Sequence, residues 1–271
     1  MKERLDVLLV KKGLAPTRQR AKVFIMEGIV FVDQQRVDKA GTQVDEQAEI
    51  FVKQNPLPYV SRGGLKLAKA IEVFGLDLDG AVCCDIGAST GGFTDCMLQH
   101  GAAKVYAVDV GYNQLDYRMR TDPRVICMEK TNIRYLDKER IKDPIDFISI
   151  DVSFISLALV FPVASALLKD AGMVTALVKP QFEAGREQVG KKGIVRDPKV
   201  HREVLAKASG YAVENGLYPC GMTFSPITGA KGNIEYLLWM TKKPSAFDAA
   251  ATAASVTEEA HNYWKEKKRQ E

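Results

Sequence analysis

Four ionisable residues are candidates for chemistry. They are Lys66 in SRGGLKL, Asp151 in SIDVSFIS, Lys179 in LVKPQFE and Glu235 in GNIEYLL. Asp151 and Lys179 each follow an apolar run that is typical of a buried strand, and charged residues are rarely buried without a partner. The carboxyl ends of parallel strands line the crevice in which open α/β sheets bind ligands. Together the four could move a proton at a bound substrate, although each alone is also compatible with a surface charge or an ion pair.

A glycine-rich segment, DIGASTGGFTDC, closes the first strand expected in the main part of the chain. Such a turn lets the backbone approach a ligand, which could be a nucleotide phosphate or the amino-acid part of S-adenosylmethionine. A phosphate-binding P-loop needs a Lys followed by Ser or Thr after its glycines, and this segment has no such pair. The dinucleotide motif needs a second glycine where this chain has Ser89, which disfavours a bound pyrophosphate.

The spacing Asp85-x-Gly87-x-x-x-Gly91 resembles the first motif of Rossmann-like methyltransferases. In that family an acid at the end of the second strand, here Asp109, accepts hydrogen bonds from both ribose hydroxyls, and the position of Asn132 often contacts adenine. S-adenosylmethionine is therefore the expected cofactor. Its expected contacts are Asp85, Gly87, Ser89, Thr90, Gly91, Gly92, Phe93, Asp109, Asn132 and Asp151.

The elements that must position these residues alternate along the chain between residues 65 and 245. Strands are expected over 81–86, 104–110, 124–128, 145–151 and 172–178, with two more near 218–224 and 233–240. Helices are expected over 65–74, 93–100, 156–169 and 200–215. This alternation predicts an α/β, Rossmann-like domain with helices on both faces of a parallel sheet. Residues 246–271 are expected to form a tail, either a solvated helix or a frayed end.

The N-terminal residues follow another pattern, two short helices and then short strands. From Arg4 to about Val52 the order of residues resembles the S-four domain, a small α+β RNA-binding fold. Its hairpin turn reads Asp33-Gln34-Gln35 instead of Asn-Gly, which predicts a looser turn. We expect this domain over residues 1–54 and a Pro/Gly-rich linker over 55–64. The expected RNA contacts are Arg4, Lys11, Arg18, Arg20, Lys22 and Arg62.

The distribution of charge agrees with an RNA partner without proving one. The net charge of +4 lies entirely within residues 1–66, which hold twelve basic and eight acidic residues. A basic patch attracts phosphates, but a solvated surface would have the same composition. The basic, glycine-rich segment 185–198, with Lys191 and Lys192, could cover a substrate strand, or it could be a mobile surface loop.

The motifs named above, with DVSFIS and KGNIEY, resemble the TlyA family over nearly the full length of the chain. The four ionisable residues resemble the Lys-Asp-Lys-Glu tetrad of ribose 2′-O-methyltransferases of the FtsJ-like type. The resemblance implies transfer of a methyl group to the ribose 2′-hydroxyl of cytidines in ribosomal RNA. It also implies ribosomal RNA or ribosomal subunits as partners.

The tetrad suggests a division of roles. A ribose hydroxyl must lose its proton as the methyl group arrives, and a lysine accepts that proton only when it is neutral. Lys66 would lower the pKa of Lys179 by like-charge repulsion, helped by burial. Our hypothesis makes Lys179 the base and lets Lys66 steer the hydroxyl. Asp151, between sulfonium and amine, and Glu235 would orient the two amines.

Other functions make distinct demands on the sequence. An RNA-binding protein with an inactive methyltransferase fold would usually have lost part of the tetrad or of the loop. Amino-methyltransferases carry Pro-Pro after the acid of the fourth strand, where this chain has Val152-Ser153, and carbon-5 enzymes need a cysteine in the crevice.

A membrane-active cytolysin, which the family's haemolysin label suggests, is disfavoured. No export signal opens the chain, and the longest apolar run, 157–168, is shorter than the roughly 20 residues that span a bilayer. A cytoplasmic protein is therefore expected. No cysteine or histidine pair has metal-ligand spacing, so no metal is expected either.

Overall fold

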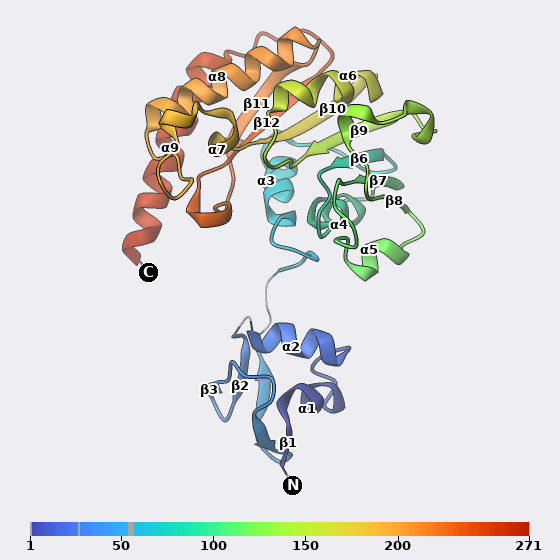
Figure 1. Ribbon diagram of the computed structural model, residues 1–271, viewed down its shortest axis with the longest axis vertical. Coiled ribbons are helices and arrows are strands. Elements are labelled where there is room, and N and C mark those ends of the chain that lie inside the picture. Colours follow the sequence, from blue (N-terminus) through green and yellow to red (C-terminus); the bar gives the residue numbers. More distant parts are fainter. Residues whose placement is uncertain (1, 27, 54–56, 271) are drawn as a thin grey trace. The chain divides into compact units, whose positions relative to one another are not determined.

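The computed structural model describes residues 2–26, 28–53 and 57–270 (Figure 1). Contacts within the chain divide it into two compact units, Met1–Pro58 and Tyr59–Glu271. The expected domain end at residue 54 and the first two residues of the expected linker, 55 and 56, lie outside the described residues.

The N-terminal unit is the α+β fold that the sequence predicts. Its apolar core joins both helices to the strands through Leu5, Leu9, Ile25 and Val30. Strand β1 pairs with β4, and the second sheet has the order β3-β2-β5. The elements are β1 (Lys2–Arg4), α1 (Leu5–Lys11), α2 (Arg18–Met26), β2 (Val30–Val32), β3 (Gln35–Arg36), β4 (Gln43–Asp45) and β5 (Ile50–Val52).

The hairpin turn between β2 and β3 is tight, so the prediction of a looser turn is wrong. Val32 pairs with Gln35, which leaves Asp33 and Gln34 as a two-residue turn with φ of 46° and 66°. Positive φ at both positions is what a type I′ hairpin requires, and aspartate tolerates it. The turn is also held from outside, because Asp33 exchanges hydrogen bonds of 2.9 and 3.0 Å with the backbone of Glu49.

The C-terminal unit contains a seven-stranded sheet of order β11-β12-β10-β9-β6-β7-β8. Strand β12 runs antiparallel to β10 and β11, and the pairs from β10 through β9, β6 and β7 to β8 are parallel. The strands are β6 (Val82–Ile86), β7 (Lys104–Val108), β8 (Val125–Met128), β9 (Ile145–Ile150), β10 (Leu168–Val178), β11 (Tyr218–Phe224) and β12 (Tyr236–Thr241).

Helices cover both faces of this sheet (Figure 1), which confirms the α/β, Rossmann-like prediction. The sheet is mixed and not wholly parallel as expected, because β12 is antiparallel to its neighbours. They are α3 (Gly64–Phe74), α4 (Gly92–Gln99), α5 (Tyr117–Thr121), α6 (Phe161–Leu167), α7 (Pro180–Glu183), α8 (Pro198–Glu214) and α9 (Ala249–Gln270). Short 3₁₀ turns lie at Ile133–Tyr135, Lys138–Arg140, Leu157–Leu159, Arg186–Gln188 and Ala230–Gly232.

The central strands are apolar because both of their faces are buried. Cys83 and Cys84 are adjacent in β6 and belong to opposite cores, since successive residues of a strand face opposite sides. The core on the Cys84 side includes residues of α6, α8 and α9, and the other includes residues of α3, α4 and α5. The sheet is thereby held rigidly, and its strand ends can position side chains.

Two expected boundaries differ from the structure. Tyr59 and Val60 are buried in the C-terminal unit, and the Val60 N–H donates a 2.7 Å hydrogen bond to Asp95. Residues 59–64, which we expected to belong to the linker, are therefore part of the larger unit.

Residues 246–271, expected to be a solvated or frayed tail, contain helix α9. It packs on α8 and β11 and buries Ala253, Val256 and Ala260. Their spacing of three and four residues places them on one face of the helix. Among the described residues, no helix is long and apolar enough to cross a membrane.

Candidate active site

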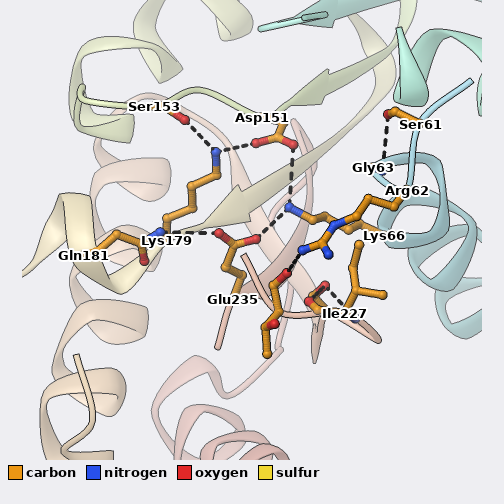
Figure 2. Close-up of polar contacts among 12 residues, drawn as sticks. Ser61, Arg62, Gly63, Lys66, Asp151, Ser153, Lys179, Gln181, Ile227 and Glu235 are labelled. Atoms are coloured by element: carbon orange, nitrogen blue, oxygen red, sulfur yellow. Dashed lines mark hydrogen bonds and ion pairs between the residues drawn. The ribbon is translucent and has the colours of Figure 1, made fainter. Parts of the chain in front are cut away.

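The four ionisable residues of the sequence analysis meet at one edge of the seven-stranded sheet (Figure 2). Asp151 follows β9 and Lys179 follows β10, which are parallel neighbours. Glu235 precedes β12, and because β12 is antiparallel to β10, its beginning lies beside the end of β10. Lys66 reaches the same point from the first turn of α3.

Short ion pairs connect the four side chains. Lys66 Nζ lies 2.6 Å from Glu235 Oε2 and 3.8 Å from Asp151 Oδ2. Lys179 Nζ lies 2.5 Å from Asp151 Oδ1. Asp151 thus contacts both amines. Lys66 and Lys179 are each 8% exposed and Glu235 is 2% exposed, so these charges interact away from bulk water.

Two further side chains hold this cluster, and the sequence analysis did not select them for that role. Lys179 Nζ donates a 3.0 Å hydrogen bond to Ser153 Oγ, and Gln181 Nε2 donates a 3.3 Å hydrogen bond to Glu235 Oε1. Both stand two residues after a tetrad member, in DVSF and KPQF. Their position two residues after a tetrad member is the signal in the sequence that could have identified them.

A pocket of about 500 Å³ opens beside the cluster, along the ends of β6, β7 and β9. Gly87, Ser89, Asp109, Asn132 and Asp151, all expected to bind the cofactor, contribute to its lining. Apolar walls come from Val108, Val110, Ile133, Val152 and Ile155. Apolar walls with a few convergent polar groups are what a nucleoside requires.

The carboxylate of Asp109 is oriented by two backbone N–H groups. Its Oδ2 accepts a hydrogen bond of 2.8 Å from the Ser89 N–H, and its Oδ1 accepts one of 2.6 Å from the Gly111 N–H. A carboxylate has about four acceptor positions, so two remain for ribose hydroxyls. Asn132 accepts a 3.1 Å hydrogen bond from the Arg134 N–H, which leaves its amide N–H groups for an adenine ring.

A smaller pocket of about 110 Å³ adjoins the first and is lined by Thr90, Gly92 and Phe93, together with Gly87, Ser89 and Asp151. Ser61 and Gly63 also line it, and no sequence pattern had selected them for cofactor binding. Gly91 lines neither cofactor pocket. With φ of 94° it serves the turn of the loop, because glycine adopts that conformation readily.

The glycines leave the smaller pocket open, and this decides whether the cofactor fits there. Gly87 has φ of 89°, and a Cβ there would lie 2.4 Å from the Asp151 carbonyl oxygen. A Cβ at Gly92 would lie 2.3 Å from Ser61 Oγ. The backbone is therefore close-packed around the smaller pocket, with Asp109 at the far end of the larger one. The smaller pocket fits the amino-acid part of S-adenosylmethionine, and the larger pocket fits its adenosine.

Asp85, also expected to contact the cofactor, lies beneath the loop and lines neither cofactor pocket. It is fully buried and accepts hydrogen bonds from Thr94 Oγ1 at 2.7 Å and Ser149 Oγ at 3.0 Å. Burial raises the pKa of Asp85 to about 7, against the effect of these two hydroxyl donors. Its contacts join the loop helix α4 to β9, so it shapes the smaller pocket from below.

A third pocket, of about 510 Å³, lies on the other side of the cluster. Lys66, Lys179 and Glu235 line it with Arg62, Gly63, Gln181, Phe182 and Gly229. Ser153 and Phe154 line both this pocket and the larger cofactor pocket, so the two spaces meet at the residues after β9. A reactive group of the cofactor and a substrate can therefore approach each other beside Asp151.

Phe154 is the most exposed large apolar side chain of this region. It is 90% exposed, and its φ of 64° is uncommon for an aromatic residue. Its ring lies 4.9 Å from that of Phe182. The loop thus holds an aromatic face at the mouth of the third pocket.

The basic residues expected to contact RNA have various surroundings. In the N-terminal unit, Arg4 and Arg18 donate hydrogen bonds of 3.0 and 2.9 Å to the buried carboxylate of Asp6. Burial opposes ionisation of Asp6, but the two guanidinium groups outweigh it and keep the pKa of Asp6 below its usual range. Arg4 and Arg18 remain 42% and 54% exposed, so they stabilise the fold and still face solvent.

The other expected RNA contacts are placed as follows. Lys11 pairs with Glu3, Arg20 lies 4.8 Å from the ring centre of Phe24, and Lys22 is exposed. Arg62 belongs to the C-terminal unit and donates a 2.5 Å hydrogen bond to the Thr228 carbonyl oxygen.

Comparisons with known proteins identify both domains of the chain. The family described as FtsJ-like methyltransferase matches residues 59–242, and the S4 domain family matches residues 3–50. The Bacillus subtilis protein YqxC is 53% identical over 272 residues, which cover 98% of this chain and 97% of that protein. The 16S/23S rRNA (cytidine-2′-O)-methyltransferase TlyA of Mycobacterium tuberculosis is 41% identical and covers 95% of this chain and 96% of its own length.

A solved structure of a hemolysin-labelled protein from Streptococcus thermophilus has a TM-score of 0.79 and 48% identity, covering 99% of this chain and 98% of that one. The fold, the two matched domains and the full-length relatives all agree. The chain therefore belongs to the TlyA family of FtsJ-like, S-adenosylmethionine-dependent methyltransferases that carry an N-terminal S4 domain.

Proposed function

We propose that this protein transfers a methyl group from S-adenosylmethionine to the ribose 2′-hydroxyl of cytidine in ribosomal RNA in the cytoplasm. The observation that carries the proposal is the cluster of Lys66, Asp151, Lys179 and Glu235 between the cofactor pockets and a third pocket. The names of the relatives support the nucleotide and the RNA class. The S4 domain supports an RNA substrate.

The chain's own residues supply positioning and proton transfer. Lys179 Nζ, which contacts Asp151 and Ser153, is the group that accepts the hydroxyl proton. Lys66 Nζ, held by Glu235 and Asp151, donates a hydrogen bond that orients the hydroxyl oxygen. When bound, S-adenosylmethionine supplies a methyl group on a positively charged sulfur, which keeps the bonding electron pair as the hydroxyl oxygen forms its bond to the methyl carbon. Aligned reactants account for much of the acceleration.

The surroundings of the cluster favour a ribose hydroxyl over a base atom as acceptor. The two residues directly after Asp151 are Val152 and Ser153, not prolines. Among the described residues that line the third pocket there is no cysteine. The exposed ring of Phe154 offers a stacking face for an unpaired base, which is how single-stranded RNA is commonly held.

The experiment follows tritiated methyl groups from S-adenosylmethionine into ribosomal RNA and subunits taken from cells that lack the enzyme. We expect 2′-O-methylcytidine on nucleoside analysis. The Lys179→Ala variant should lose transfer but bind the cofactor with nearly unchanged affinity, because Lys179 does not line the cofactor pockets. Label on a base, or turnover retained by Lys179→Ala, would contradict the proposed chemistry.

A further inference from the structure

A groove of about 660 Å³ lies beside the active site in the C-terminal unit. One wall is the last part of α9, drawn in red in Figure 1, and contributes His261, Trp264, Lys265 and Lys268. The opposite wall consists of two loops, 194–196 after α7 and 228–234 before β12. We call this space the α9 groove.

The α9 groove is strongly cationic. Arg196, Lys231, Lys265 and Lys268 line it, and all four are exposed. No carboxylate is among its lining residues, and none of the four cations forms an ion pair with another described residue. Asp197, the acid next to Arg196, is engaged as the cap of α8 and accepts a 2.8 Å hydrogen bond from the Lys199 N–H. Such a concentration of unpaired positive charge attracts a polyanion.

The two loops of the wall are fixed to each other. Asn233, which is 2% exposed, donates a 2.9 Å hydrogen bond to the Gly193 carbonyl oxygen and accepts one of 3.1 Å from the Val195 N–H. The His201 ring, fully buried, lies with Nε2 3.0 Å from the Val195 carbonyl oxygen. These contacts hold Arg196 and Lys231 on a defined surface.

The α9 groove adjoins the pocket that holds the tetrad. Ile234 lines the groove and its neighbour Glu235 lines the tetrad pocket. Likewise Thr228 lines the groove and Gly229 lines the tetrad pocket. A single loop therefore separates the two spaces, and a chain molecule that leaves the tetrad pocket across this loop enters the groove.

Trp264 adds an aromatic surface between the cations. Its partly buried ring contacts Tyr263 edge-on, with ring centres 5.1 Å apart, and Lys267 Nζ lies 4.9 Å from its ring centre. Aromatic rings set in a basic groove are a recurrent way of holding single-stranded nucleic acid, because every base has a face that can stack.

We propose that the α9 groove binds the phosphodiester backbone of the substrate RNA beside the methylated nucleotide. The proposal rests on the proposed function, which places an RNA nucleotide in the tetrad pocket. Arg196, Lys231, Lys265 and Lys268 contact phosphates, and they fix the register of the strand without reading its sequence. The C-terminal helix thus extends the RNA-binding surface of the enzyme beyond the S4 domain.

The test compares two double variants of the full-length protein. Lys265→Gln with Lys268→Gln removes two cations from the groove. Lys142→Gln with Lys243→Gln removes two exposed lysines at the opposite edge of the sheet, since Lys142 precedes β9 and Lys243 follows the antiparallel β12. Both lose the same charge, so a difference between them reports position and not net charge. Thermal unfolding of both variants verifies that they fold.

Filter binding measures the dissociation constant of unmodified ribosomal RNA between 50 and 200 mM salt. Each lost phosphate contact reduces the slope of log K against log salt by about 0.7 to 0.9, so we expect the slope to fall by about 1.4 to 1.8 for the groove variant. The ratio of the variant's dissociation constant to that of wild type therefore falls about seven- to twelvefold as the salt concentration rises fourfold. We expect KM for RNA to rise, with kcat and cofactor affinity unchanged.

An unchanged slope and affinity in the groove variant, or equal losses in the two variants, would overturn the proposal. A failure of the proposed function is distinguishable from both results. In that case wild type transfers no methyl to RNA, whereas the binding measurement, which needs no turnover, still compares the two variants.

Discussion

The substitution Gly229→Ala asks whether the Glu235 carboxylate must stay where the structure places it. Gly229 has φ of −68° and ψ of −175°, a conformation open to any residue, so the backbone tolerates alanine. The added Cβ would lie 1.9 Å from Glu235 Oε1 and 2.5 Å from Glu235 Cδ. Raising 1.9 Å to an ordinary contact of 3.4 Å requires the carboxylate to move by about 1.5 Å.

Such a shift disrupts the 2.6 Å contact between Glu235 and Lys66 and frees the Lys66 amine. A hydrogen bond to a charged group is worth about 1.5–3 kcal/mol. If Lys66 thereby loses the orientation that it needs only in the transition state, kcat falls roughly 10- to 150-fold at about 1.4 kcal/mol for each factor of ten. The affinity for S-adenosylmethionine should stay unchanged, because Gly229 does not line the cofactor pockets.

The assay is the initial rate of tritiated methyl transfer at saturating cofactor and RNA, with cofactor affinity measured by calorimetry. Gly210→Ala is a matched control, because it adds the same methyl group on α8, where a Cβ meets nothing within 4 Å. Alanine is favoured over glycine in a helix by about 1 kcal/mol, so this control should keep its activity and gain stability. A kcat of Gly229→Ala equal to that of wild type would refute the reasoning about Glu235.

Two further predictions concern binding and acid stability. Asp109→Asn removes the charge that faces ribose hydroxyls, so the dissociation constant for S-adenosylmethionine should rise roughly 10- to 150-fold by calorimetry; an unchanged constant would remove Asp109 from the cofactor site. Burial lowers the pKa of His201 from 6.5 to about 4. The unfolded chain therefore binds a proton at His201 below about pH 6.5, whereas the folded chain binds it only below about pH 4. Stability falls as the pH drops through this window. Between pH 7 and pH 5 the loss due to His201 is about 2 kcal/mol. Urea unfolding should show a smaller loss for His201→Gln, and equal losses in both proteins would contradict the assignment.

The residues that follow parallel strands were the most predictable part of the site. Asp151 and Lys179 stand directly after apolar runs, and the alternation of strand and helix places the ends of such runs at one edge of a sheet. Glu235 is different, because it precedes its strand. It reaches the same edge only because β12 is antiparallel to β10, and hydrophobic periodicity does not report the direction of a strand. Only the resemblance to a known tetrad suggested it.

The direction of a side chain was the least predictable property. The motif Asp85-x-Gly87 identifies the residue but does not show where its side chain points. In the structure the side chain of Asp85 turns away from the cofactor pockets toward Thr94 and Ser149. The same limit applies to Arg18, whose inward contact with Asp6 no spacing could reveal. For α9 the pattern existed, since Ala253, Val256 and Ala260 share a face, but alanines carry a weak hydrophobic signal.

The four charges of the tetrad have a consequence for the folding of the domain that contains them. Two cations and two anions leave bulk water when the chain folds, before any RNA is present. Buried ion pairs are commonly less stabilising than apolar side chains of similar volume. The tetrad is preorganised for methyl transfer, and the same buried charges therefore lower the stability of the folded state. A pseudoenzyme descended from this chain, free to replace the four residues with well-packed apolar ones, would be expected to melt at a higher temperature than its active ancestor.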